Sequence, residues 1–142
     1  MNGDLLARTI AQLAQLERKV ASLHVVSMPV LHITFNGNAS TAWGNILMDV
    51  DGYHVDTQVA TVALPAAKMG IISGYIRGGA GNVALRILVD GVVAGGGQQN
   101  GADGTKVAAI GGGWSGGGTM QIQVISDTNT TVAGELWLIA AF

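Results

Sequence analysis

Residues 4–23 read DLLARTIAQLAQLERKVASL, and this stretch decides how the rest of the chain is interpreted. Apolar side chains recur along it at alternating steps of three and four residues, the 3.5-residue repeat of helices that wind around copies of themselves. With Leu6 at heptad position a, every a and d position is apolar except Thr9. The predicted seam residues are Leu6, Leu13, Leu16, Val20 and Leu23.

This seam predicts that the protein is an oligomer, and we expect a trimeric coiled coil. Leu5 and Ile10 occupy the neighbouring g and e positions and widen the apolar stripe, which favours more than two helices. Because the seam is shorter than three heptads, we expect a second contact between copies further along the chain. A single amphipathic helix that packs on its own domain is the alternative that this pattern leaves open.

Charged residues are scarce in the chain. They make up 11% of its 142 residues, whereas 49% are hydrophobic, so the surface is either polar without charge or covered in an assembly. The net charge of -2, with no run of Lys or Arg, argues against nucleic-acid and membrane partners. No signal peptide and no membrane-spanning segment of about 20 apolar residues is expected. The absence of cysteine excludes disulfides and thiolate chemistry.

The pattern changes from helical to alternating after Pro29. Strands are predicted over 31–35, 45–50, 53–64 (one strand or two, stopped by Pro65), 70–77, 83–89, 92–94, 105–110, 120–124 and 135–142. The turn Asp90-Gly91 gives the clearest hairpin, and the glycine-rich stretches 95–104 and 111–118 are predicted loops. The sequence therefore predicts an oligomerising helix with linker (1–28) and a mainly β domain (29–142), an antiparallel β-sandwich of jelly-roll type.

The final strand is apolar on both faces. One face carries Leu136, Leu138, Ala140 and Phe142, and the other carries Trp137, Ile139 and Ala141. A strand of this kind is either central in the sheet or packed against another subunit. Trp137 is therefore a predicted trimer-interface residue together with the helical seam.

Two motifs suggest chemistry, and their surroundings argue against it. Residues 113–117 match the G-x-S-x-G spacing around a nucleophilic Ser115, but no helix follows and the chain has only three histidines. Asp49-Val-Asp51-Gly52 resembles the opening of a calcium loop, yet a Glu six residues after the glycine is missing, so a hairpin turn is the plainer interpretation. We expect no enzyme activity, no cofactor and no metal.

Two tryptophans are candidate partner contacts. Trp43 lies in a predicted loop and Trp114 lies between glycine triplets; an exposed Trp is a frequent anchor for a partner surface or a sugar. A Trp114 that folds back over the end of the sheet is the alternative. The stretches Asn38–Ser40 and Asn129–Thr131 match the N-glycosylation pattern and are interpreted as turns.

A resemblance adds to these observations. The helix with LAQLERKVASL (13–23), the glycine-rich, cysteine-free β domain and the ending GELWLIAAF (134–142) resemble small trimeric virion proteins of tailed bacteriophages, namely capsid decoration (cement) proteins and short head or tail fibres. The plan is also similar to trimeric jelly rolls of the C1q/TNF type. The likeness is one of layout and covers the full length, and no motif carries a functional residue over.

The resemblance implies a structural virion protein, a homotrimer on the capsid surface that contacts the major capsid protein and is made in the host cytoplasm. The alternative is a fibre or receptor-binding protein that recognises a host surface glycan through Trp43 or Trp114. A hydrolase that uses Ser115 is the third hypothesis.

Overall fold

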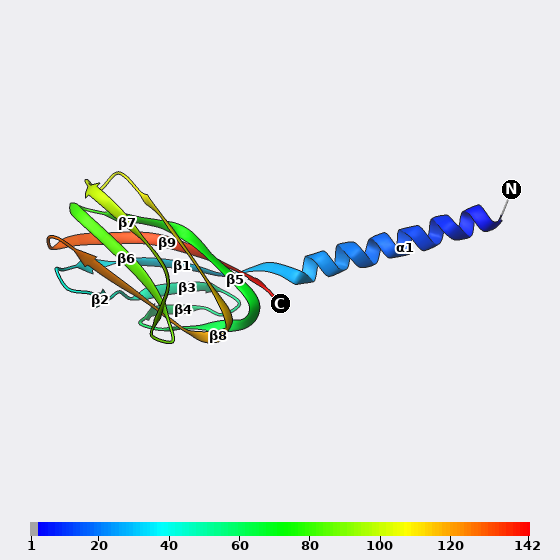
Figure 1. The fold of residues 1–142 in the computed structure, drawn as a ribbon, viewed down its shortest axis with the longest axis horizontal. Coiled ribbons are helices and arrows are strands. Elements are labelled where there is room, and N and C mark those ends of the chain that lie inside the picture. The colour runs from blue at the N-terminus through cyan, green and yellow to red at the C-terminus, as the bar shows by residue number, and fades with distance from the viewer. Residues whose placement is uncertain (1–2) are drawn as a thin grey trace.

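The computed structural model describes residues 3–142, with side chains described for residues 4–16 and 31–142. One helix precedes nine strands: α1 (Gly3–Val26), β1 (Ser27–Ala39), β2 (Gly44–Asn45), β3 (Met48–Gly52), β4 (Asp56–Val59), β5 (Val62–Gly78), β6 (Gly81–Val89), β7 (Val92–Ala102), β8 (Ala108–Ser126) and β9 (Thr130–Ala141). The strands gather in one body, and α1 is directed away from it (Figure 1).

All strand pairs are antiparallel, and the strand order is β4-β3-β1-β9-β5-β8-β6-β7, with β2 beside β8. The first half of β8 pairs with β5, whereas its second half pairs with β6 and β2. The long strands therefore join two layers, one of β3, β1, β9 and β5 and the other of β2, β8, β6 and β7. The chain is an antiparallel β-sandwich of jelly-roll type, which confirms the predicted fold class.

The core lies between the two layers because alternate side chains of each strand point inward. One layer contributes Ile33, Ile72, Leu136 and Leu138, and the other contributes Val83, Leu85, Ile87, Ile122 and Val124. All of them are at least 97% buried. Each such side chain stabilises the folded chain by about 1.5–3 kcal/mol relative to its exposure to water.

The prediction for the final strand is confirmed. β9 lies between β1 and β5, with Leu136, Leu138 and Ala140 completely buried and with Trp137 and Ile139 on the outer face. Ala141 still pairs with Met69, so the strand continues almost to the C-terminus. Phe142, expected to share the inner row, is instead half exposed at the end of the strand.

The prediction that the two glycine-rich stretches are loops is wrong for most of their length. Residues 95–102 lie inside β7 and residues 111–118 lie inside β8, where Gly95 pairs with Gly112 and Gly96 pairs with Gly111, while Asp103 and Gly104 lie in the connection after β7. A Cβ on Gly95 would lie 2.4 Å from the carbonyl oxygen of Gly111, so the two backbones meet at a distance that only glycine permits. Because the glycine-rich stretch between them is extended as well, the strands predicted over 105–110 and 120–124 belong to one strand, β8.

Pro65 does not stop a strand, contrary to prediction. It lies within β5 where the register with β8 shifts between Leu64 and Ala67, a place where the missing N–H removes no ladder hydrogen bond. The predicted stretch 53–64 divides into β4 and the beginning of β5. The predicted hairpin at Asp90-Gly91 is confirmed, with φ of 50° and 80°.

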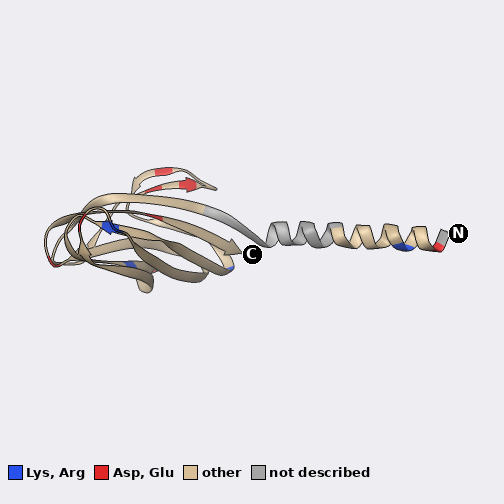
Figure 2. Cartoon of the chain, turned by 90° about the horizontal axis from the view of Figure 1, so that it is seen from above, with Lys and Arg blue, Asp and Glu red and all other residues tan. Residues whose placement is uncertain are grey.

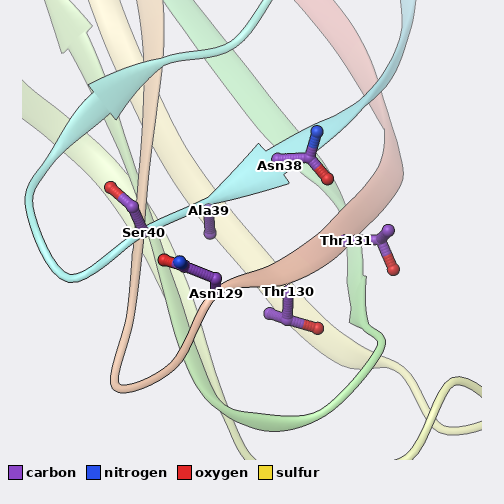
Figure 3. A pocket seen from close by; sticks show the side chains of 6 residues that line it. All are labelled: Asn38, Ala39, Ser40, Asn129, Thr130 and Thr131. Atoms are coloured by element: carbon purple, nitrogen blue, oxygen red, sulfur yellow. The ribbon is translucent and has the colours of Figure 1, made fainter.

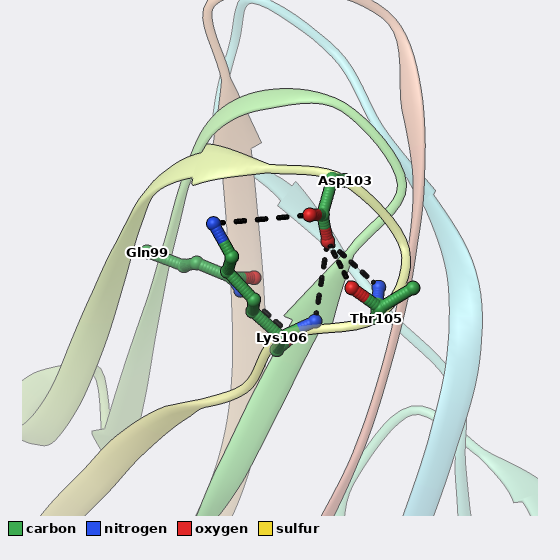
Figure 4. A network of polar contacts seen from close by, with 4 residues as sticks. All are labelled: Gln99, Asp103, Thr105 and Lys106. Atoms are coloured by element: carbon green, nitrogen blue, oxygen red, sulfur yellow. Dashed lines mark hydrogen bonds and ion pairs between the residues drawn. The ribbon is translucent and has the colours of Figure 1, made fainter.

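The connection between β7 and β8 is held by side chains, as Figure 4 shows. The buried Gln99 accepts a hydrogen bond from the Gly78 N–H (2.8 Å) and donates one to the Lys106 carbonyl (2.7 Å). Asp103 Oδ1 accepts from the backbone N–H and the hydroxyl of Thr105 and from the Lys106 N–H. These bonds, that of the Thr105 hydroxyl first, lower the pKa of Asp103 from its ordinary 3.8.

Gly95→Ala is expected to lower the free energy of unfolding by about 1–3 kcal/mol, the usual cost of overpacking, because the new methyl group meets the backbone of β8. Gly117→Ala is the control, since its methyl group meets nothing closer than 3.7 Å. Urea unfolding of both variants at one protein concentration measures the difference. Equal midpoints would show that close approach is not the reason for the glycines.

Thr105→Val is expected to raise the pKa of Asp103 toward 3.8, because it removes the first hydrogen bond to the carboxylate. A group with a lowered folded pKa contributes stability above its unfolded pKa, and this stability is lost as pH falls through the folded value. NMR titration of the Asp103 carboxyl carbon in the wild type and the variant measures the shift. An unchanged titration would assign the lowered pKa to another cause.

Candidate functional site

The described seam residues of α1 face solvent. Leu6, Leu13 and Leu16 are 61%, 55% and 57% exposed, and Leu5 and Ile10 beside them are equally exposed. Thr9, the polar residue of the seam, donates a hydrogen bond from its hydroxyl to the Leu5 carbonyl at 3.0 Å. Its hydroxyl proton therefore has an acceptor within the helix. The side chains of Val20 and Leu23 lie outside the described residues. The described part of the stripe is therefore not covered by the chain's own sheet.

A second exposed apolar surface lies on the outer face of β5 and β9. We call it the apolar sheet face and define it by Met69, Ile71, Trp137 and Ile139, all of which are at least 36% exposed. The register aligns Ile71 with Ile139 and Ser73 with Trp137, so these side chains form adjacent rows on one face. The C-terminus, at which the face ends, lies beside the point where α1 joins the sheet (Figure 1).

The apolar sheet face ends in a small aromatic and polar cluster. His32 on β1 stacks on Trp137 with ring centroids 5.1 Å apart and planes 13° apart, and Tyr75 approaches the other side at 6.3 Å. His32 Nε2 lies 3.6 Å from Glu135 Oε2, too far for a hydrogen bond, and among the described residues no hydrogen-bond partner reaches this buried atom. Trp137 is thus held in place, although 40% of it stays exposed.

The two candidate contact tryptophans differ. Trp114 is buried to 93%, packs its ring against Gly70 and donates its Nε1–H to the Pro65 carbonyl at 3.1 Å. The prediction that it contacts a partner from a mobile loop is therefore wrong, and the alternative of a Trp folded over the sheet end is the observed one. Trp43 is 38% exposed, and the Arg86 guanidinium lies 4.2 Å from its ring centroid.

The two glycosylation-like stretches come together at the end of the sandwich opposite α1. Asn38 pairs with Thr131 and Ala39 with Thr130, so neither stretch is wholly a turn. With Ser40 and Asn129 they line an open hollow of about 500 Å³ (Figure 3). Asn38 and Thr131 point to a different side of the ribbon from Ser40 and Asn129 (Figure 3).

The motifs that suggested chemistry do not assemble an active site. Ser115 is exposed, and no hydrogen bond joins it to His32 or His54; the His24 side chain lies outside the described residues. In the calcium-like stretch, Asp49 accepts hydrogen bonds from Gln58, and His54 Nδ1 lies 3.0 Å from Asp56. No group of three or more potential metal ligands occurs among the described residues.

Charge is spread thinly over the molecule. Figure 2 shows few charged residues on the described part of the chain and no continuous patch of one sign in that view. In the part of the chain that the structure describes, α1 lacks the length of apolar sequence that a membrane-crossing helix needs. The features that stand out are therefore apolar and aromatic: the seam of α1, the apolar sheet face and Trp43.

Comparisons with known proteins give no family. No family model matches the chain, and no curated protein matches it. Solved structures with a similar fold include a Bacillus endospore appendage of disulfide-linked pili (12% identity, 81% of this chain and 91% of that chain, TM-score 0.42). They also include a carbohydrate-binding module in complex with calcium and xylotriose (15% identity, 72% of this chain and 92% of that chain, TM-score 0.43). Murine APRIL is a third (8% identity, 74% of this chain and 98% of that chain, TM-score 0.44). At these values the likeness transfers no function or binding residue to this chain.

Proposed function

We propose that this protein is a structural homotrimer of a tailed-phage virion, a decoration protein that sits on the capsid and clamps neighbouring capsid subunits. The observation that carries the proposal is the exposed seam of α1, whose leucines lie on a helix directed away from the sandwich (Figure 1). A stripe of this kind in water favours association with copies of itself.

The apolar sheet face supplies the second contact that a short seam needs. Each seam leucine contributes about 1.5–3 kcal/mol when it is fully buried. Trp137 and Ile139 lie on a strand that ends beside the junction with α1, so copies that meet along the helices bring their sheet faces together as well (Figure 1). One continuous interface from Leu6 to Trp137 is the arrangement that we propose.

One feature favours three copies. Leu5 and Ile10 are exposed beside the seam and give it the width that a third helix covers. Mass determination by light scattering tests the number directly, because a trimer has three times the 14.5 kDa mass of the chain.

The capsid role rests on the resemblance in layout together with the thinly charged surface. Particles that lack the protein, mixed with the purified trimer, are expected to bind it, with density at threefold positions of the capsid. Failure of the protein to co-purify with particles would overturn this part of the proposal and leave the trimer untouched. The fibre alternative stays open through Trp43, which is exposed, and no longer through Trp114.

Leu16→Ala is expected to weaken the trimer, because deletion of a buried leucine costs about 2–5 kcal/mol. The variant dissociates at a higher protein concentration than the wild type in a light-scattering dilution series. Gln15→Ala is the matched control, since Gln15 neighbours Leu16 but lies off the seam. An unchanged mass for Leu16→Ala across the series would show that the helix does not hold the copies together.

Ile71→Asp is expected to lower the oligomer mass while the sandwich stays folded, because it places an unpaired charge in the interface and leaves the core untouched. Val92→Asp is the control, an equally polar substitution at an exposed position of the β6–β7 hairpin. Circular dichroism monitors the fold and light scattering the mass. Equal masses for the two variants would remove the apolar sheet face from the interface.

A further inference from the structure

A row of polar side chains crosses three strands on the outer face of the second layer. Asn45 on β2 is paired with Gln123 on β8, which is paired with Arg86 on β6. Gln123 Nε2 donates to Asn45 Oδ1 at 3.0 Å, and Arg86 Nε donates to Gln123 Oε1 at 2.8 Å. The three side chains therefore hold one another in fixed positions instead of moving freely in solvent.

Trp43 lies against Arg86 of this row. Its ring has one face against the Arg86 guanidinium, 4.2 Å from the centroid, while 38% of the residue stays open to solvent. Only the Nε–H of Arg86 is used within the row, and no carboxylate among the described residues lies within ion-pair distance of it. A flat aromatic surface and unused guanidinium donors thus lie side by side.

A hollow lies next to the row on the same face. Two residues further along each strand, a step of about 7 Å, Ile125 is paired with Ala84 and Ala84 with Gln98. These residues line a hollow of about 280 Å³, together with Asn82, Val83, Ser126 and Asp127. This volume is just below the range of about 300–1,000 Å³ for drug-sized ligands, so it suits one small ring.

We infer that this outer face binds a saccharide, which stacks one ring on Trp43, places a neighbouring ring in the hollow over Ala84 and Ile125, and receives hydrogen bonds from Arg86, Gln123 and Gln98. The inference deepens the fibre alternative, in which Trp43 contacts a host glycan, and it does not depend on the trimer or on the capsid role. The face lies on the opposite side of the core from the apolar sheet face, so it stays accessible whether the protein is a monomer or a trimer.

The chemistry of the face matches that of a sugar. A pyranose ring has an apolar face of C–H groups, which suits the indole of Trp43 and the aliphatic floor of the hollow. Its edge carries hydroxyls that both donate and accept, as do the amides of Gln98 and Gln123. A phosphate-rich ligand suits the face less well, because Asp127 lies at the far end of the hollow opposite Arg86.

The test uses the full-length wild-type protein on an array of neutral and carboxylate-bearing glycans, followed by NMR titration with the free oligosaccharide that binds best. We expect chemical-shift changes at the Trp43 indole, Ala84 and Gln123. Trp43→Ala is expected to raise the dissociation constant at least tenfold, and Gln123→Ala several-fold. Tyr53→Ala is the control, since it removes an exposed aromatic side chain that belongs neither to this face nor to the apolar sheet face, and it is expected to leave the dissociation constant unchanged.

Preference for carboxylate-bearing glycans supports a contact with the free Arg86 donors. Preference for neutral glycans supports stacking on Trp43 as the main contribution to the binding free energy. The inference is overturned if no glycan binds, if Trp43→Ala binds as the wild type does, or if the shifts map to the hollow at Asn38 and Thr131. Binding to a host protein without any glycan also overturns it. Because the titration reports each site separately, loss of the trimer does not affect its outcome.

Discussion

The register of β9 is the constraint on which the rest of the molecule depends. Side chains of a strand alternate between its two faces, so a slip by one residue would exchange every inner residue for an outer one. In the observed register Leu136 and Leu138 complete the core, while Trp137 and Ile139 form part of the apolar sheet face. The same strand thus fixes the interior of the sandwich and its most apolar exterior, and it does so because both of its neighbours, β1 and β5, pair with it over most of its length.

Glycine allows the second layer to close. β7 approaches β8 at the pair Gly95 and Gly112, where a Cβ on either residue would collide with the backbone of the opposite strand, and a Cβ on Gly96 would collide with the Leu85 carbonyl oxygen of β6. Gly70 provides the corresponding space beneath Trp114, whose indole fills the end of the core and bonds to Pro65. The glycine-rich composition therefore serves dense strand packing, and the tryptophan that looked like an exposed anchor is a part of the interior.

Much of the fold could be predicted because it depends on local periodicity. The alternation at 83–89 and 135–142 and the Asp90-Gly91 turn predicted strands and a hairpin that the structure contains. The glycine stretches could not be predicted as strands, since their preference for extended structure comes from a neighbouring backbone and not from their own side chains. The contact of Trp43 with Arg86 could not be predicted either, because Arg86 is 43 residues away in the sequence and meets Trp43 only through the register of β2, β8 and β6. Met69 and Ile71 form an apolar pair on the strand face opposite Ile72, and this pattern is present in the sequence. It indicates an exposed apolar face only once the strand is known to be central in the sheet.

The edges of the sheet have a consequence for how copies of this chain can come together. At one end of the strand order, β7 turns back to pair with β8, and at the other end β4 is only four residues long and carries Asp56. Long, unpaired apolar edges are what allow β proteins to add strands from other chains without limit and to form fibrils. Among the described strands the outermost ones are short, closed or charged. Although the chain is nearly half hydrophobic, the edges of its sheet therefore disfavour amyloid-like growth. Its apolar faces remain able to contact a finite number of neighbouring copies.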